Sequence, residues 1–111
     1  MYKVGQGLFG KLIFNDGVYP EYDRAYLVVH VSDEKVGVLD VSSAVGKGNQ
    51  LLYDSNKYIN KHNPPFPKKT FAKLKSLRYV KIENMPKMKI LSGGDTLDKA
   101  ELSNILKELK I

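Results

Sequence analysis

The chain has 111 residues, of which 42% are hydrophobic, and its formal net charge is +6. This length is enough to bury one hydrophobic core and too short for two ordinary ones, so residues 1–111 are expected to form a single domain. The sequence contains no cysteine, which excludes disulfides, thiolate metal sites and cysteine nucleophiles.

The N-terminal residues 1–7 lack the basic-then-apolar order of a signal peptide. No apolar run approaches the roughly 20 residues that a helix needs to span a bilayer. We therefore expect a cytoplasmic protein without a membrane partner, and the absence of cysteine fits a reducing compartment.

Strand patterns occupy the first half of the chain. The first predicted strand covers residues 8–14, and Gly10 within it indicates a bulge or a tight bend. Two β-branched runs follow at 24–31 and 36–43, and they are joined by a polar connector at 32–35 that is rich in turn-forming residues. We expect the two runs to pair as an antiparallel hairpin.

Polar side chains stand at the open end of this hairpin. In an antiparallel pair the start of the first strand lies beside the end of the second, so Arg24 is expected to share one rim with Ser42 or Ser43. The loop before the arginine carries two carboxylates, Glu21 and Asp23. Loops on a strand scaffold commonly hold functional residues.

The second half of the chain is expected to contain loops, short strands and one helix. The loops and strands are a glycine-containing loop at 44–50, a short strand at 50–53, an irregular proline-containing loop at 54–69, strands at 70–74 and 77–82, and a linker at 84–94.

Asp98 and Glu101 have the spacing of a helix capping box, and Leu97 and Leu102 occupy the staple positions around it. Apolar residues then continue at helical spacing to Leu109. Five or six short strands plus one C-terminal helix indicate a mainly β fold, either a small closed barrel or an α+β domain.

Metal, nucleotide and serine-hydrolase motifs are absent from the sequence. The histidines, His30 and His62, lack cysteines or clustered carboxylates at metal-ligand spacing, so we expect chemistry without a metal or other cofactor. His30, within a strand, is expected to be a packed or interface residue, whereas His62 is compatible with proton transfer or with no role. Lys47 lies between two glycines without the P-loop spacing, and Ser42 has no nucleophile elbow around it.

Positive charge is concentrated between Lys57 and Lys89. This segment holds ten basic residues and one acidic residue, a net charge of +9, and the rest of the chain is at −3. Such a zone attracts phosphate backbones, and the aromatic residues among the lysines suit stacking with single-stranded bases; the alternative is an ordinary solvated surface over core aromatics. The residues predicted to contact RNA are Lys47, His62, Lys68, Lys69, Lys73, Lys75 and Arg78.

RNA can be cleaved without a metal because its own 2′-hydroxyl supplies the nucleophile. A guanidinium presents a planar fork that matches phosphate oxygens, and a serine hydroxyl donates to another oxygen. Arg24, Ser42 and the nearby acids are compatible with such a site. The alternative interpretation is that Arg24 is a solvated residue at a strand start and that Ser42 and Ser43 only end the next strand.

The order of these features resembles the MazF/PemK family of toxin endoribonucleases over nearly the whole chain. The matching pieces are Gly10 before the apolar residues 12–14, Arg24 opening the run 27–29, a strand ending in Ser42 and Ser43, the strand pair around Arg78, and a C-terminal helix that starts Leu-Asp-Lys-Ala-Glu-Leu.

Three positions depart from the family pattern. Lys11 stands where members commonly have Asp, Ala25 stands where they have Pro, and Lys73 or Lys75 stands where some members carry an acid.

The resemblance implies a small SH3-like β-barrel, a homodimer and a toxin of a type II toxin-antitoxin system that a cognate antitoxin inhibits. It implies metal-independent cleavage of single-stranded RNA to a 2′,3′-cyclic phosphate, with Arg24 and Ser42 in catalysis and Ser43 in reserve. The general base stays open between Glu21, Asp23 and His62. The alternative function is a non-catalytic RNA-binding or partner-binding SH3-like barrel.

Overall fold

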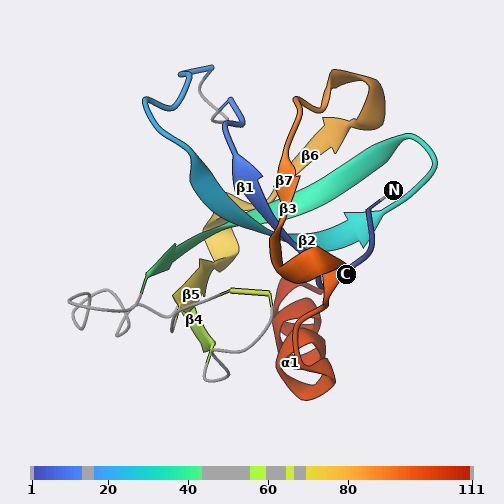
Figure 1. The fold of residues 1–111 in the computed structure, drawn as a ribbon. Coiled ribbons are helices and arrows are strands. Elements are labelled where there is room, and N and C mark those ends of the chain that lie inside the picture. Colours follow the sequence, from blue (N-terminus) through green and yellow to red (C-terminus); the bar gives the residue numbers. More distant parts are fainter. Residues whose placement is uncertain (1, 14–16, 44–55, 60–64, 67–69, 111) are drawn as a thin grey trace.

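The computed structural model describes residues 2–13, 17–43, 56–59, 65–66 and 70–110 (Figure 1). Within these residues the chain forms a mainly β structure with one C-terminal helix, as the sequence predicts. The elements are β1 (Gly7–Gly10), β2 (Arg24–Val31), β3 (Lys35–Ser43), β4 (Asn56–Ile59), β5 (Thr70–Lys73), β6 (Arg78–Lys81), β7 (Lys89–Ile90) and α1 (Lys99–Leu109).

The strands form one seven-stranded antiparallel sheet. Its order is β4-β5-β3-β2-β1-β7, and β6 lies off this path, paired with β3. The pairings among the described residues make an open path, so the sheet is established by the structure and the predicted SH3-like barrel stays a prediction.

The predicted hairpin of β2 and β3 is confirmed, and it is the central pair of the sheet. Ala25 to Val28 pair with Val41 to Val38 in uninterrupted antiparallel register, and a bulge follows between Val28 and His30. The connector is closed by Ser32, whose backbone nitrogen donates to the Lys35 carbonyl at 2.9 Å and whose Oγ accepts from the Lys35 nitrogen at 3.2 Å. Serine in a turn commonly bonds to the backbone in this way.

β3 changes its partner halfway along its outer edge. Its first half pairs with β6 and its last three residues pair with β5, and the short 3-10 helix η2 (Leu74–Ser76) joins these two partners. At the change, the Asp40 backbone nitrogen donates to Ser76 Oγ at 2.7 Å, and that hydroxyl donates to the Lys73 carbonyl at 2.6 Å. Ser76 therefore satisfies a backbone donor of β3 between the two ladders.

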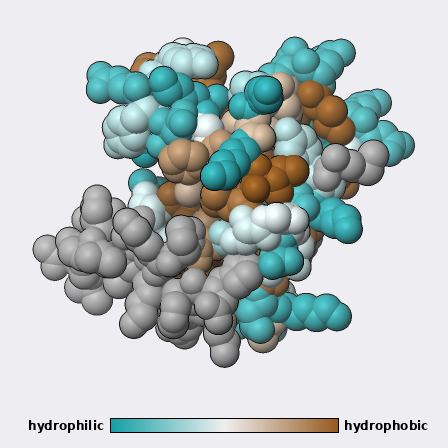
Figure 2. Space-filling view, in the orientation of Figure 1, coloured by the Kyte–Doolittle hydropathy of each residue, from teal (hydrophilic) through white to brown (hydrophobic). Residues whose placement is uncertain are grey.

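The two faces of the hairpin contribute to two hydrophobic clusters. Leu27 and Leu39 belong to the cluster that also contains Ile105 of α1, whereas Tyr26 and Val38 belong to the other cluster. Since both faces are covered, β2 and β3 have nearly continuous apolar runs in the sequence. Apolar atoms gather near the middle of the side shown in Figure 2, with hydrophilic side chains around them.

The structure corrects several sequence predictions. β1 is shorter than the predicted strand 8–14, and Gly10 pairs in regular register with Arg24, so of the two features predicted there, a bulge or a tight bend, the bulge is wrong. A Cβ on Gly10 would lie 2.6 Å from the Met88 sulfur, so a larger residue there would require the flexible Met88 side chain to shift. β4 lies in the region predicted to be irregular, and β7 lies in the predicted linker. The predicted strand at 50–53 lies outside the described residues.

No helix within the described part of the chain is long and apolar enough to cross a membrane.

The capping signal correctly predicts the start of α1. Asp98 is the N-cap residue, and its carboxylate accepts from the Glu101 backbone nitrogen at 3.3 Å. The staple residues Leu97 and Leu102 both contribute to the cluster that contains Ile105. The local sequence thus fixes where the helix begins and which side faces the sheet.

Replacing Asp98 by Ala is expected to lower the free energy of unfolding by about 1 kcal/mol, because one helix N–H loses its acceptor. Urea denaturation followed by circular dichroism measures this loss. Asp95→Ala is the matched control, since Asp95 is exposed and lies outside the helix; an equal loss in both variants would contradict the capping role.

Candidate functional site

The open end of the β2–β3 hairpin brings the two main predicted site residues together. Arg24 is the first residue of β2, and Ser42 is the second-last residue of β3. Ala25 pairs with Val41, so Arg24 and Ser42 occupy the next opposed positions toward the open end of the hairpin. Opposed residues of an antiparallel pair project from the same face. Arg24 and Ser42 therefore share one rim and one face, as the hairpin predicts.

The guanidinium of Arg24 is held by the residue two places before it. Arg24 Nη2 donates to the Tyr22 hydroxyl at 3.2 Å, and the guanidinium carbon lies 4.9 Å from the centre of the Tyr22 ring. The arginine itself is only partly buried. This contact restricts the side chain while it leaves the arginine accessible at the edge of the sheet.

Two exposed carboxylates precede the arginine. Glu21 and Asp23 lie on either side of Tyr22 in the connection from β1 to β2, and both are exposed. Their position keeps the two acids close to Arg24 along the chain. The geometry does not select one of them as the base.

Ser42 and Ser43 continue into the β5 side of the sheet. Ser42 pairs with Phe71 and Ser43 pairs with Thr70. Ser42 is partly buried, and its backbone lies between β2, which begins at Arg24, and the buried Phe71 of β5.

A buried ion pair lies on the same face, one step inward from the rim. Arg78 is only 6% exposed, and its Nη2 donates to Asp40 Oδ1. Its Nη1 donates to the Ile13 carbonyl at 2.7 Å, and the guanidinium carbon lies 5.4 Å from the centre of the Tyr26 ring. The Tyr26 hydroxyl accepts from the Leu12 backbone nitrogen at 3.2 Å. A buried charge needs such a set of partners, because desolvation is costly.

This network anchors the start of the β1–β2 connection to the sheet. Leu12 is held by Tyr26 and Ile13 is held by Arg78, so the segment that leads to Glu21 and Asp23 starts from a fixed point. Sequence reasoning placed Arg78 among the RNA contacts and did not identify Asp40. The signal for Asp40 was an acid within the apolar run of β3, at a position that requires a buried cationic partner.

The remaining predicted RNA contacts occupy different settings. Lys73 is partly buried at the end of β5, and Lys75 is exposed in η2. Arg78 is buried, so its guanidinium is already used within the protein. Lys47, His62, Lys68 and Lys69 lie outside the described residues. The contacts of all these residues with RNA stay predictions.

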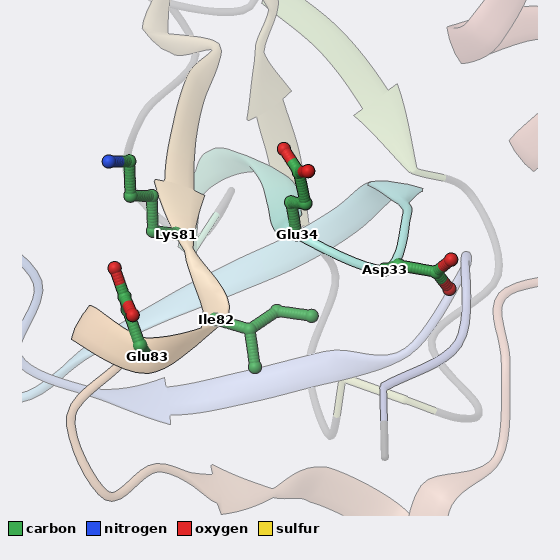
Figure 3. Close-up of a pocket in the computed structure, with 5 residues that line it drawn as sticks. All are labelled: Asp33, Glu34, Lys81, Ile82 and Glu83. Atoms are coloured by element: carbon green, nitrogen blue, oxygen red, sulfur yellow. The ribbon is translucent and has the colours of Figure 1, made fainter.

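A hollow of about 450 Å³ lies at the other end of the hairpin. It is lined by the connector residues Asp33 and Glu34 and by residues 81–83, and the carboxylates of Asp33 and Glu34 point in different directions (Figure 3). Ligand pockets commonly have polar groups that converge on one point. The hollow lacks this convergence and is separated from Arg24 by the length of β2.

Among the described residues, no three His, Cys, Asp or Glu side chains form a group that could hold a metal ion. The expectation of metal-independent chemistry rests on the sequence and stays a prediction.

Replacing Asp40 by Leu is expected to lower the free energy of unfolding by about 3–5 kcal/mol, because the buried Arg78 charge loses its carboxylate. Chemical denaturation measures the loss. The double variant Asp40→Leu/Arg78→Met should lose less than Asp40→Leu alone, since no buried charge then remains unpaired. If the loss in the double variant equals the sum of the losses in Asp40→Leu and Arg78→Met, the two residues are not coupled.

No protein-family model, no curated protein and no solved structure matches the chain. The resemblance to the MazF/PemK family therefore stays a prediction from the sequence motifs.

Proposed function

We propose that the protein is a metal-independent endoribonuclease of the MazF/PemK type, the toxin of a type II toxin-antitoxin system. The observation that carries the proposal is the β2–β3 register, which puts Arg24 and Ser42 at one rim and on one face. An arginine and a hydroxyl so placed can bind two oxygens of one phosphate. The substrate class that suits a metal-free site of this kind is single-stranded RNA.

In the proposed reaction a base removes the proton of the 2′-hydroxyl, and the 2′-oxygen attacks the adjacent phosphorus. The bond to the 5′-oxygen breaks, and that oxygen leaves with a proton from an acid. The products are a 2′,3′-cyclic phosphate and a 5′-hydroxyl end. The base is drawn from Glu21, Asp23 and His62, which are the alternatives left by the sequence.

Arg24 stabilises the extra negative charge of the phosphorane in this proposal. Its planar fork donates to two phosphate oxygens, and a donor aimed at charge that develops in the transition state contributes about 3–4 kcal/mol. Ser42 donates to another oxygen of the same phosphate, with Ser43 as the alternative hydroxyl. The contact with Tyr22 supports this role because it reduces the number of orientations that Arg24 can adopt.

Lysines supply the long-range attraction for RNA in the proposal. Lys75, Lys81, Lys87 and Lys89 are all exposed in the described part of the basic zone, and clustered positive charge accelerates association with phosphate backbones. The complete assembly would be a homodimer with an SH3-like barrel in each subunit, located in the cytoplasm and inhibited by a cognate antitoxin.

Purified protein is expected to cleave a long single-stranded RNA in the presence of EDTA and to leave 2′,3′-cyclic phosphate ends. Arg24→Ala should lower kcat by about 10²- to 10³-fold, because the phosphorane loses its main donor. Arg24→Lys should recover only part of the rate, since an ammonium cannot form the bidentate fork. Gel analysis and end-group mapping provide the measurements.

The control is Lys107→Ala on α1, which removes one exposed positive charge from the helix and should leave kcat unchanged. Intact RNA with measurable binding would support the non-catalytic RNA-binding alternative. An Arg24→Ala protein that cleaves at the wild-type rate would show that Arg24 has no catalytic role.

The logarithm of the association constant for single-stranded RNA is expected to fall linearly with the logarithm of the salt concentration. In the Arg24→Ala background, Lys75→Ala should reduce the slope by about 0.7 if this lysine contacts one phosphate. Fluorescence anisotropy at several salt concentrations measures the slope. Lys107→Ala in the same background should not change it, and equal slopes for the Lys75 variant and its parent would remove Lys75 from the interface.

A further inference from the structure

Exposed apolar side chains are concentrated in the connection between β1 and β2. Ile13 and Val18 are each 54% exposed, Tyr19 is 60% exposed and Tyr22 is 61% exposed. These four belong to the seven large hydrophobic residues that are exposed in the described part of the chain. The connection extends beyond the sheet at the upper left of Figure 1, in blue, and of these four side chains Tyr22 contacts Arg24.

Tyr22 and Tyr19 are equally exposed but differ in their surroundings. The ring of Tyr22 lies 4.9 Å from the Arg24 guanidinium carbon, and its hydroxyl accepts a hydrogen bond from Arg24 Nη2. These contacts hold the ring next to the arginine. Its 61% exposure leaves a large part of the ring available to a ligand.

We infer that Tyr22 forms a nucleobase-stacking subsite that takes a base next to the scissile phosphate. This inference rests on the proposed function and adds a subsite to it. The ring centre lies only 4.9 Å from the guanidinium carbon, and a nucleobase is separated from its phosphate by a single sugar. The arginine can therefore bind the phosphate while the ring stacks on the attached nucleobase.

The two carboxylates that flank Tyr22 favour a nucleobase over a phosphate as the group that contacts its ring. Glu21 and Asp23 are exposed on either side of Tyr22, and carboxylates repel phosphate oxygens. They accept hydrogen bonds from the exocyclic amino groups of bases. The division of roles follows from this arrangement: Arg24 binds the phosphate, and the Tyr22 ring binds the nucleobase.

The test couples a change in the protein with a change in the RNA. The cleavage site is first mapped on a single-stranded oligonucleotide, and abasic nucleotides are then placed on its 5′ or 3′ side. Wild-type protein is expected to lose roughly 5- to 150-fold in kcat/KM at one of these abasic positions. Tyr22→Ala should show a loss of at least this size on the intact oligonucleotide, because the contact with Arg24 is lost as well, and no further loss on the abasic one.

Two further variants separate stacking from other effects. Tyr22→Phe keeps the ring and removes the hydroxyl that contacts Arg24, so its kcat should fall on the intact and the abasic oligonucleotide alike, while the additional loss at the abasic position should stay as large as in the wild type. Tyr19→Ala is the matched control, because it removes an equally exposed ring from the same connection, and it should behave as wild type. Circular dichroism checks that each variant is folded.

Additive effects of Tyr22→Ala and the abasic nucleotide would overturn the inference, as would a Tyr22→Phe variant that is no longer sensitive to the abasic position. If wild-type protein cleaves no RNA, the proposed function fails separately. The same coupling is then measured in the Kd for the intact and abasic oligonucleotides by anisotropy. A coupled loss in Kd would support the stacking subsite, and additive losses in Kd would overturn it.

Discussion

The buried ion pair between Arg78 and Asp40 is the interaction on which the arrangement of the rim depends. It joins β6 to β3, and the same guanidinium holds the Ile13 carbonyl at the start of the β1–β2 connection. Burying two charges is unfavourable unless their partners are in place. The pair therefore stabilises one arrangement of three segments over alternatives in which a charge is left unpaired.

This arrangement connects the interior of the protein with its candidate site. Tyr26 lies two residues after Arg24 on β2, and Asp40 lies two residues before Ser42 on β3, so each rim residue shares its face with a member of the buried network. The rim residues are partly exposed because they stand at strand ends, while the network beneath them is buried and hydrogen-bonded. A phosphate-binding site needs this combination of exposed donors and fixed support.

Local sequence signals predicted the parts of the fold that local chemistry determines. The turn residues around Ser32 and the cap at Asp98 satisfy nearby backbone groups, so the hairpin and the helix could be recognised without the rest of the chain. β4 and β7 could not, because strands of four and two residues exist only through pairing with distant segments. The Asp40–Arg78 pair was missed for the same reason, since its partners are 38 residues apart. Arg24 and Ser42 were placed at one rim by the hairpin alone, and their roles stay predictions.

The bulge between Val28 and His30 reverses the alternation of side chains along β2. Odd-numbered residues before the bulge and odd-numbered residues after it face opposite sides of the sheet. Val29 contributes to the cluster that contains Ile105, yet Val31 packs against the opposite cluster, so the extra residue changes which face the later positions use. The pairs from Ala25 to Val28 lie before the bulge and run in uninterrupted register to the rim. Removing the extra residue of the bulge would therefore exchange the face of Val31 and leave Arg24 and Ser42 on the face that they share with Tyr26 and Asp40.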